Sequence, residues 1–273
     1  MPPSLHDWRP KPRGHRLVVG LDARGAAWQA PGEAQVRTGD HAGLGAALAA
    51  LSAMPGATVA SVQLVAGADI AVHWVLAPPA VAHLAELRQV AQARCAGLFG
   101  GSAASWRVTG DWSAQHPFAC AGLDATRAAA VERSLAPLRV PVHWQTAWGL
   151  LARHAAHAFP ADGWSVLRSP SRLLVWQCRA GRPHTLTGLP AAPGASPEAL
   201  AAQAWGHVRL ESARVPPGEA GPGPLHWLDL CTGQAPQAEG IVQAAVPGTA
   251  AAGVVDEAGA ALALARRLQG SRR

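Results

Sequence analysis

Few side chains in this sequence combine the type and the spacing that catalysis or metal binding needs. His154 and His157 lie three residues apart, which places two imidazoles on one face of a helix, where they can share a metal ion. The predicted helix around them holds no acidic residue and no third histidine, so we interpret the pair as part of a helix surface. Ser102 and Ser105 follow two glycines, but the chain has neither a G-x-S-x-G elbow nor a G-x-x-x-x-G-K phosphate loop. These patterns give no support to a hydrolase.

The four cysteines are spread over the chain and form no C-x-x-C pair. They are Cys95, Cys120, Cys178 and Cys231. This spacing argues against a zinc ribbon, a redox motif and a disulfide framework. We interpret them as small buried hydrophobic residues.

The basic charge of the chain lies at its two ends. The sequence carries 23 Lys and Arg against 17 Asp and Glu. Residues 1–16 hold four basic side chains and one acidic one, and residues 266–273 hold four arginines. The remaining body therefore has 15 basic and 16 acidic side chains, a net charge of about −1. It lacks the continuous basic stripe that nucleic acids require, so we expect no nucleic-acid partner. Such ends favour at most a weak attraction to anionic lipid, about 1 kcal/mol per basic residue.

Length and composition describe an ordinary globular chain of 273 residues, 49% hydrophobic and 15% charged. The longest apolar run, residues 68–82, is interrupted by Asp69, His73 and a pair of prolines, so no stretch reaches the ~20 residues of a membrane span. Residues 1–16 have no apolar core before a cleavage site, so we expect no secretory signal. The expected location is the cytoplasm.

The order of predicted elements indicates two α/β halves that meet near residues 160–163. Predicted strands cover 16–22, 26–30, 34–38, 58–65, 69–76, 105–109, 117–122, 140–145, 164–168, 171–179, 183–189 and 225–230. Predicted helices cover 41–53, 79–98, 124–136, 147–158, 197–212 and 255–268. A β-meander opens each half, and this repetition is typical of the duplicated actin-like (ribonuclease-H-like) fold. We expect a flexible basic lead at 1–16, a first half at 17–160, and a second half at 161–273 that includes a Pro/Gly-rich connector and the C-terminal helix.

Part of the chain resembles a known family of actin-like proteins. The resemblance runs through the strand from Asp69 to Pro78, the helix from Leu84 to Leu98 with Phe99-Gly100 after it, Ala104–Val108, Pro117–Ala121, Val142–Gln145 and Gly163–Leu167. In this order these segments resemble the PilM-like proteins and the cytoplasmic part of GspL, from the inner-membrane platforms of type IV pili and type II secretion. The resemblance covers about half of the chain and rests on element order with scattered Trp, Gly and Pro positions.

The resemblance implies a nucleotide site, because actin-like ATPases hold phosphates in two β-hairpins that need Asp and Gly. In the first hairpin Asp22 is present, but Arg24 stands where nucleotide binders usually have Gly. That arginine can instead donate to a phosphate itself or lie on the surface of a turn.

The other two nucleotide elements are weaker. The second hairpin, residues 164–171, has neither Asp nor Gly, so it offers no carboxylate to hold Mg²⁺. The third element contains Asp229 and Gly233 and resembles an adenosine-binding turn with one glycine in place of two. We therefore expect a pseudo-ATPase with no cofactor. The alternative is an actin-fold ATPase or small-molecule kinase that uses Asp22 and Asp229 with ATP and Mg²⁺.

Eight of the 11 tryptophans are candidates for the core or for the surface. Six that fall in predicted strands are expected to fill the two cores: Trp28, Trp74, Trp106, Trp164, Trp176 and Trp227. Trp8 and Trp112 fall outside these strands, and exposed tryptophan is a common anchor at interfaces. We predict that one of these two contacts a partner, with a local packing role as the other interpretation.

These observations and the resemblance lead to one expected function. The chain is expected to be a cytoplasmic scaffold, peripheral to the inner membrane, in a type IV pilus or type II secretion-like platform. In the proteins that it resembles, a groove on the first half receives a short cytoplasmic peptide of a membrane-spanning partner. The sequence ends at Arg273 with no membrane helix, so we expect the anchor to belong to another chain.

Overall fold

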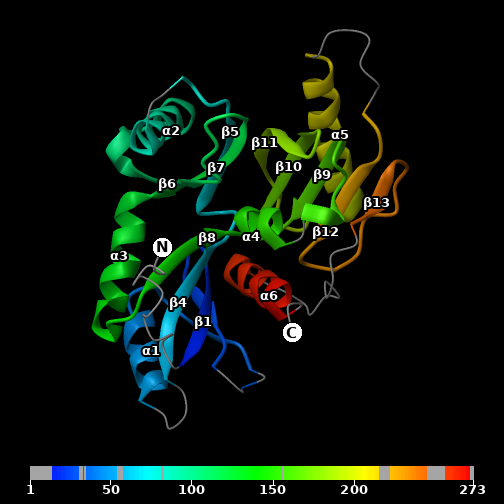
Figure 1. The fold of residues 1–273 in the computed structure, drawn as a ribbon. Coiled ribbons are helices and arrows are strands. Elements are labelled where there is room, and N and C mark those ends of the chain that lie inside the picture. Colours follow the sequence, from blue (N-terminus) through cyan, green and yellow to red (C-terminus); the bar gives the residue numbers. More distant parts are fainter. Residues whose placement is uncertain are drawn as a thin grey trace, which may run out of the picture.

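Two five-stranded sheets have the same strand order and the same strand directions. The computed structural model describes residues 14–30, 33, 35–53, 58–80, 83–154, 156–214, 222–244 and 256–270 (Figure 1). In each sheet three antiparallel strands form a meander, and two further strands run parallel to the first one. The predicted duplication and the α/β actin-like fold class are therefore confirmed.

The first sheet has the order β3-β2-β1-β4-β8. Its strands are β1 (His15–Leu21), β2 (Ala26–Trp28), β3 (Arg37–Gly39), β4 (Val59–Ala66) and β8 (Val142–Thr146). Helices α1 (Leu44–Ser52) and α3 (Ala125–Leu135) pack on one face of this sheet and bury leucines and valines against it. Asp124 begins α3 as predicted, since its carboxylate accepts the backbone N–H of Arg127 at 2.7 Å.

The second sheet has the order β11-β10-β9-β12-β13. Its strands are β9 (Gly163–Arg168), β10 (Arg172–Arg179), β11 (Arg182–Pro190), β12 (Leu225–Asp229) and β13 (Ile241–Gln243). Helix α5 (Pro197–Ser212) covers one face, where it packs against Trp164 and Trp227. Its bounds agree with the prediction because Ser196 caps it and Pro197 starts it.

A smaller unit is inserted between β4 and β8 of the first half. It consists of the sheet β5-β7-β6 and helix α2 (Leu84–Phe99). The strands are β5 (Ala71–Leu76), β6 (Trp106–Gly110) and β7 (Phe118–Asp124). Strand β5 lies beside β11, so the insertion also contacts the second half (Figure 1).

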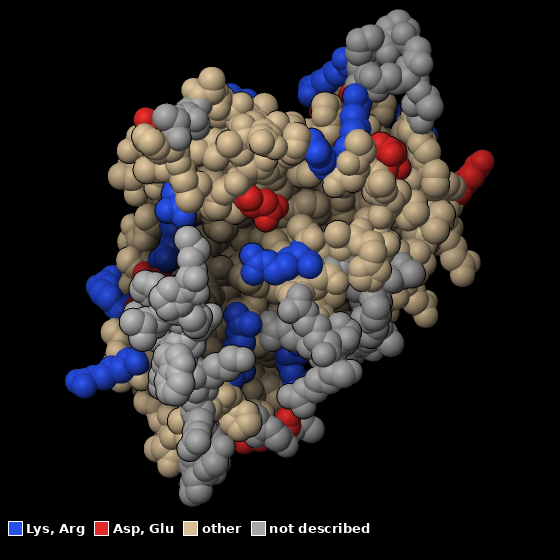
Figure 2. Space-filling model, viewed as in Figure 1, with Lys and Arg blue, Asp and Glu red and all other residues tan. Residues whose placement is uncertain are grey.

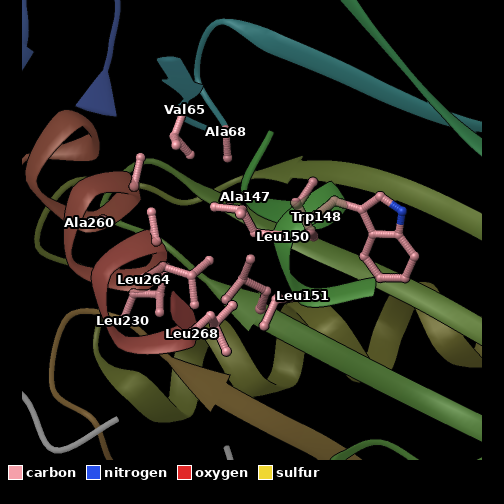
Figure 3. Packing of buried hydrophobic residues seen from close by; sticks show 14 of the residues in the cluster. Val65, Ala68, Ala147, Trp148, Leu150, Leu151, Leu230, Ala260, Leu264 and Leu268 are labelled. Atoms are coloured by element: carbon pink, nitrogen blue, oxygen red, sulfur yellow. The ribbon is translucent and has the colours of Figure 1, made fainter. Parts of the chain in front are cut away.

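Two helices lie between the sheets of the two halves. Helix α4 (Ala147–His154) follows β8, and α6 (Glu257–Gly270) is the last helix of the chain. Figure 3 shows Leu264 and Leu268 of α6 facing Leu150 and Leu151 of α4. Helix α6 belongs to the second half by sequence, but it packs along β1 of the first half. It therefore joins the two halves, while the residue ranges 17–160 and 161–273 stay a prediction.

Within the described residues, short 3₁₀ segments lie at Ala103–Ser105, Ala136–Leu138 and Ala156–Ala158. Among the described residues, no helix has both the length and the apolar content for crossing a membrane.

Several local predictions were wrong. The strand predicted at 34–38 is only Arg37–Gly39, and the helix predicted from 79 begins at Leu84. Leu84, the first residue of this helix, is 47% exposed. Strand β13 was missed, because Ala, Gly and Pro around it hide its short β-pattern.

The residues predicted to fill the core are buried, with three exceptions. The exceptions, which are half-buried, are Trp106, Cys178 and Cys231. Trp106 packs against the buried residues of α2 and its neighbouring strands. The other five strand tryptophans and the other two cysteines are buried.

Candidate functional site

The first candidate hairpin connects β1 to β2 and contains Asp22. The carboxylate is buried, and its Oδ1 accepts the backbone N–H groups of Arg24 and Gly25, both at 2.7 Å. Its Oδ2 accepts the N–H of Ala258 from the first turn of α6, at 3.4 Å. Asp22 therefore caps its own turn and the start of α6. Arg24 is an exposed residue of this turn.

The second hairpin connects β9 to β10 through Ser169, Pro170 and Ser171. Sequence reasoning found no carboxylate in it, but the structure brings Glu257 to it from the first turn of α6. Three groups donate to Glu257 Oε1, each at 2.7 Å: the Ser169 hydroxyl, the Ser171 hydroxyl and the Ser171 N–H. The Glu257 side chain is only 5% exposed. A residue more than 80 positions away thus supplies the carboxylate of this hairpin.

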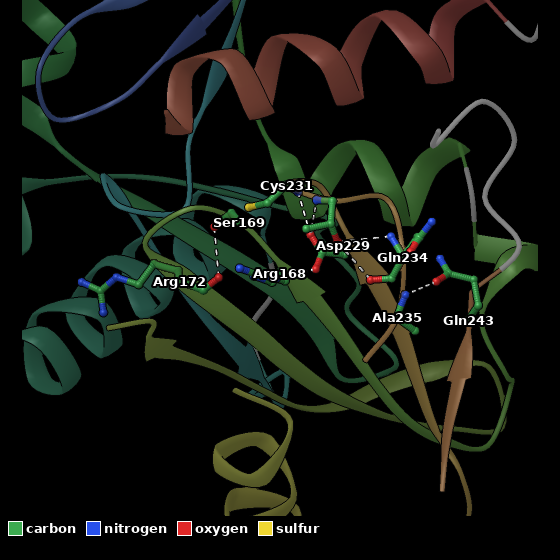
Figure 4. A network of polar contacts seen from close by, with 9 residues as sticks. Arg168, Ser169, Arg172, Asp229, Cys231, Gln234, Ala235 and Gln243 are labelled. Atoms are coloured by element: carbon green, nitrogen blue, oxygen red, sulfur yellow. Dashed lines mark hydrogen bonds and ion pairs between the residues drawn. The ribbon is translucent and has the colours of Figure 1, made fainter. Parts of the chain in front are cut away.

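The third element is the turn after β12, and it holds Asp229 (Figure 4). Asp229 is fully buried, and its Oδ2 pairs with Arg168 Nη1 at 2.8 Å. Its Oδ1 accepts the N–H groups of Cys231 at 2.7 Å and Thr232 at 2.9 Å. Gly233 has φ of 73°, a left-handed conformation in which a glycine is favoured. Both oxygens of Asp229 thus have partners within the protein.

A fourth carboxylate, Asp69, lies next to the first hairpin and was missed. Its Oδ2 accepts the N–H of Ala23 at 2.7 Å, and its Oδ1 has no hydrogen-bond partner within the described ranges. Burial raises the pKa of Asp69, and the negative charges of Glu257 and Asp22 raise it further. The only sequence signal was its place after Gly67 in the turn between two strands. Asp22, Asp69 and Glu257 therefore gather where α6 begins.

These groups do not fit a magnesium-bound triphosphate in the arrangement seen. Both carboxylates that the alternative function needs, Asp22 and Asp229, hold backbone N–H groups or an arginine. The donors of the second hairpin are directed to Glu257. Within the described parts of the chain, no three His, Cys, Asp or Glu residues are placed to hold a metal ion.

Of the two tryptophans predicted to contact a partner, only one is described. Trp8 lies outside the described residues. Trp112 is half-buried, with its ring 5.9 Å from that of Phe118 and the Arg88 guanidinium 5.5 Å from its centre. These contacts give Trp112 a packing role in the insertion, and its role at an interface stays a prediction.

A separate groove lies between the insertion and the first sheet. Its polar part is formed by the ends of β6 and β8 and by α4, with Thr109, Gln145 and Arg153 among its side chains. Burial raises the pKa of Asp111 in this groove, and the charge of Arg153 opposes that shift. In the described structure β8 pairs only with β4, and β6 only with β7. Both strands are therefore edge strands of their sheets.

An apolar cavity of about 400 Å³ adjoins the groove and shares Asp111 and Trp148 with it. Its walls come from α4 and from β10 and β11 of the second half, and include Leu151, Phe159 and Trp176. The rings of Trp148 and Phe159 each meet the Trp176 ring edge-on, with centroids 4.8 and 4.9 Å apart. The groove and the cavity together extend from the insertion to the second half.

Comparison with known proteins gives the fold and little sequence similarity. No protein-family model matches the chain, and no curated protein matches it by sequence. The cytoplasmic domain of EpsL, an inner-membrane component of the type II secretion system of Vibrio cholerae, is similar in structure. Its TM-score is 0.51 at 14% identity, over 94% of this chain and 95% of that one.

Two further solved structures are similar over most of their length. One is a Bacteroides thetaiotaomicron protein of unknown function with an actin-like ATPase fold, at TM-score 0.50 and 9% identity, over 80% of this chain and 82% of that one. The other is the PilM-PilN type IV pilus biogenesis complex, at TM-score 0.49 and 12% identity, over 81% and 82%. The first two likenesses agree with the duplicated topology, and the chain has an actin-like fold.

Proposed function

We propose that this protein is a scaffold of an inner-membrane platform of the type II secretion or type IV pilus kind, and that it does not use nucleotide. It works in the cytoplasm at the inner face of the membrane, and it binds a short cytoplasmic peptide of a membrane-spanning partner. The observation that carries the proposal is the likeness to the EpsL cytoplasmic domain over nearly the whole of both chains.

The loss of nucleotide use is supported by the contacts of the two hairpins. A triphosphate needs backbone donors that face the cleft and a carboxylate that can hold Mg²⁺ or its water. Here Asp22 is engaged by three N–H groups, and Glu257 takes the donors of the second hairpin. A phosphate at the second hairpin would have to displace a buried carboxylate.

The groove between β6, β8 and α4 is the proposed peptide site. An extended peptide can pair with the backbone of an exposed strand edge, while pockets alongside take its side chains. The edges of β6 and β8 supply the first of these features, and the adjoining apolar cavity supplies the second. Arg153 in the groove and Asp111 at the wall shared with the cavity provide charges of both signs that can orient the peptide.

The charge on the face seen in Figure 2 agrees with a protein partner better than with nucleic acid. Figure 2 shows the Lys and Arg side chains as separate spots on a mostly uncharged face, with acidic residues between them. Binding to a phosphate backbone requires a continuous basic track. We therefore propose no nucleic-acid partner, and only weak contact with the membrane surface.

Peptide binding is the direct test. The proposal expects a single-span membrane protein to be encoded beside this gene, and the probe is a fluorescently labelled peptide of its short cytoplasmic segment. We expect saturable anisotropy changes, and we expect Arg153→Glu to weaken binding about tenfold by reversing a charge in the groove. Arg209→Glu is the matched control, because Arg209 is an exposed arginine of α5 on the second half. Equal binding by both variants would contradict the proposed groove.

Calorimetric titration with ATP and Mg²⁺ tests the second part of the proposal. We expect no heat of binding from the full chain. Micromolar binding that is lost in Asp22→Ala would overturn the scaffold function in favour of the ATPase or kinase alternative.

A further inference from the structure

The second hairpin has the features of a site for a small oxyanion. Ser169 is 3% exposed and Ser171 is half-buried, and between them they direct two hydroxyls and one backbone N–H to a single carboxylate oxygen. Backbone and hydroxyl donors that converge in a turn are the usual means by which proteins bind anions. Here the bound anion is the side chain of Glu257.

Glu257 is hydrogen-bonded to the hairpin although two other carboxylates, Asp22 and Asp69, lie nearby. Glu257 is buried close enough to Asp69 for its charge to raise the pKa of that residue, and Asp22 contributes in the same direction. Burying a carboxylate among others costs free energy unless it is well hydrogen-bonded. Three donors, each 2.7 Å from Glu257 Oε1, offset that cost. The partial positive charge at the N-terminal end of α6, where Glu257 lies, also stabilises the carboxylate.

The contact also joins the two halves. The first turn of α6 lies directly on β1, where a Cβ added to Gly20 would be 1.9 Å from the Ala258 carbonyl oxygen. The neighbouring Glu257 is held by the hairpin of the second sheet. One helical turn is therefore fixed to the first half by its backbone and to the second half by its side chain.

We propose that the hairpin at residues 169–171 is a binding site for a small monoanion, and that Glu257 is its internal ligand. In this role Glu257 is a latch that fixes the second half against α6 and the first half. A carboxylate of similar size, such as formate, can take its place when the side chain is removed. Formate carries one negative charge, as the Glu257 carboxylate does, so the charge of the site stays the same. A polyanion would be disfavoured, because it would bring more negative charge next to Asp22 and Asp69. The inference does not depend on the proposed peptide partner.

Chemical rescue of Glu257→Ala in the full chain tests the proposal. In sodium chloride we expect the Tm of this variant to lie below that of the wild type. In sodium formate at equal ionic strength we expect its Tm to rise and to saturate with formate concentration. The wild type should have the same Tm in both salts. Glu198→Ala is the matched control, since Glu198 is an exposed glutamate in the first turn of α5, and it should show no formate effect.

Hydrogen exchange locates the effect. In Glu257→Ala we expect amide exchange at 169–172 to be faster on the order of tenfold, the effect of losing a charged hydrogen bond, and formate to slow it again. Exchange within α5 should not change. A folded Glu257→Ala whose Tm and exchange respond equally to formate and chloride would overturn the proposal.

If Glu257→Ala does not fold, Glu257→Gln tests the same contact between the carboxylate and the hairpin. It keeps the size of the side chain and one acceptor but loses the charge. We expect faster exchange at 169–172 in Glu257→Gln and no change in Glu198→Gln. Unchanged exchange in Glu257→Gln would show that the carboxylate is not the ligand of this hairpin.

Discussion

The hairpins that open the two halves have the same topology and opposite chemistry. Between β1 and β2, Asp22 is part of the hairpin and accepts the N–H groups of its own turn. Between β9 and β10, the turn has only hydroxyl and backbone donors, and Glu257 comes to it from α6. The two hairpins therefore share a backbone arrangement, but each obtains its carboxylate from a different place. The first has it within its own turn, and the second receives it from α6.

The largest loss of stability is expected from breaking the buried ion pair of Arg168 and Asp229 in the second half. Asp229→Ala leaves Arg168 without its partner and two backbone N–H groups without an acceptor, so we expect a loss of about 4 kcal/mol in the free energy of unfolding. Urea denaturation measures it. Adding Arg168→Met should recover part of the loss, because it removes the unpaired charge. No recovery would show that the turn, and not the ion pair, carries the effect.

The contact of α6 with the first half is tested at Gly20. Gly20→Ala would force α6 away from β1, and we expect a loss of about 3 kcal/mol. The control is Gly206→Ala in α5, whose added Cβ has no atom within 4 Å and which should be neutral or stabilising. Equal stability of the two variants by urea denaturation would mean that α6 does not depend on this close approach.

The self-capping of the first hairpin is tested at Asp22. Asp22→Ala should lower the free energy of unfolding by about 2 kcal/mol, because three N–H groups lose their acceptor. Both Asp22 and Glu257 hold the first turn of α6, so the double variant with Glu257→Ala should lose less than the sum of the single losses. Strict additivity would show that the two hairpins act independently.

The smallest expected effect on stability comes from Asp69, and it depends on pH. Its pKa is raised in the folded protein, so the folded state holds this proton more tightly than the unfolded state does. Its contribution to stability is full below the unfolded pKa of 3.8 and is lost as the pH rises through the folded value. We expect Asp69→Asn to be the more stable protein at neutral pH, with the difference narrowing toward pH 4. Thermal unfolding over this range measures it, and a difference that widens at low pH would contradict the assignment.

Much of the fold was predictable because it depends on local patterns. β-branched runs such as residues 16–22 mark buried strands, and caps such as Asp124 and Ser196 mark the starts of helices. The repeated meander, together with the family resemblance, predicted the duplicated topology. Alanine obscured other features, since it fits either face of an element, and for this reason β13 was missed.

The candidate site was predictable only where its residues are neighbours in sequence. Asp22 and Gly25 stand within one hairpin turn, and Asp229 and Gly233 stand within the turn after β12, so both elements could be recognised from the sequence. Their spacing did not show that both carboxylates are engaged by N–H groups or by Arg168. Glu257 carried no local signal, and Asp69 carried only its place after Gly67 in a turn, because their contacts join segments far apart in the chain.

The sequence by itself determined the alternation of strands and helices, the absence of a local carboxylate in the second hairpin, and the near-neutral body. Only the tertiary structure decided that Glu257 would fill that hairpin, since the decision depends on where α6 lies between the two sheets. Hydrogen bonding and burial act at distances of a few ångströms in space, and 86 positions of sequence separate Glu257 from Ser171. Folding alone brings them together.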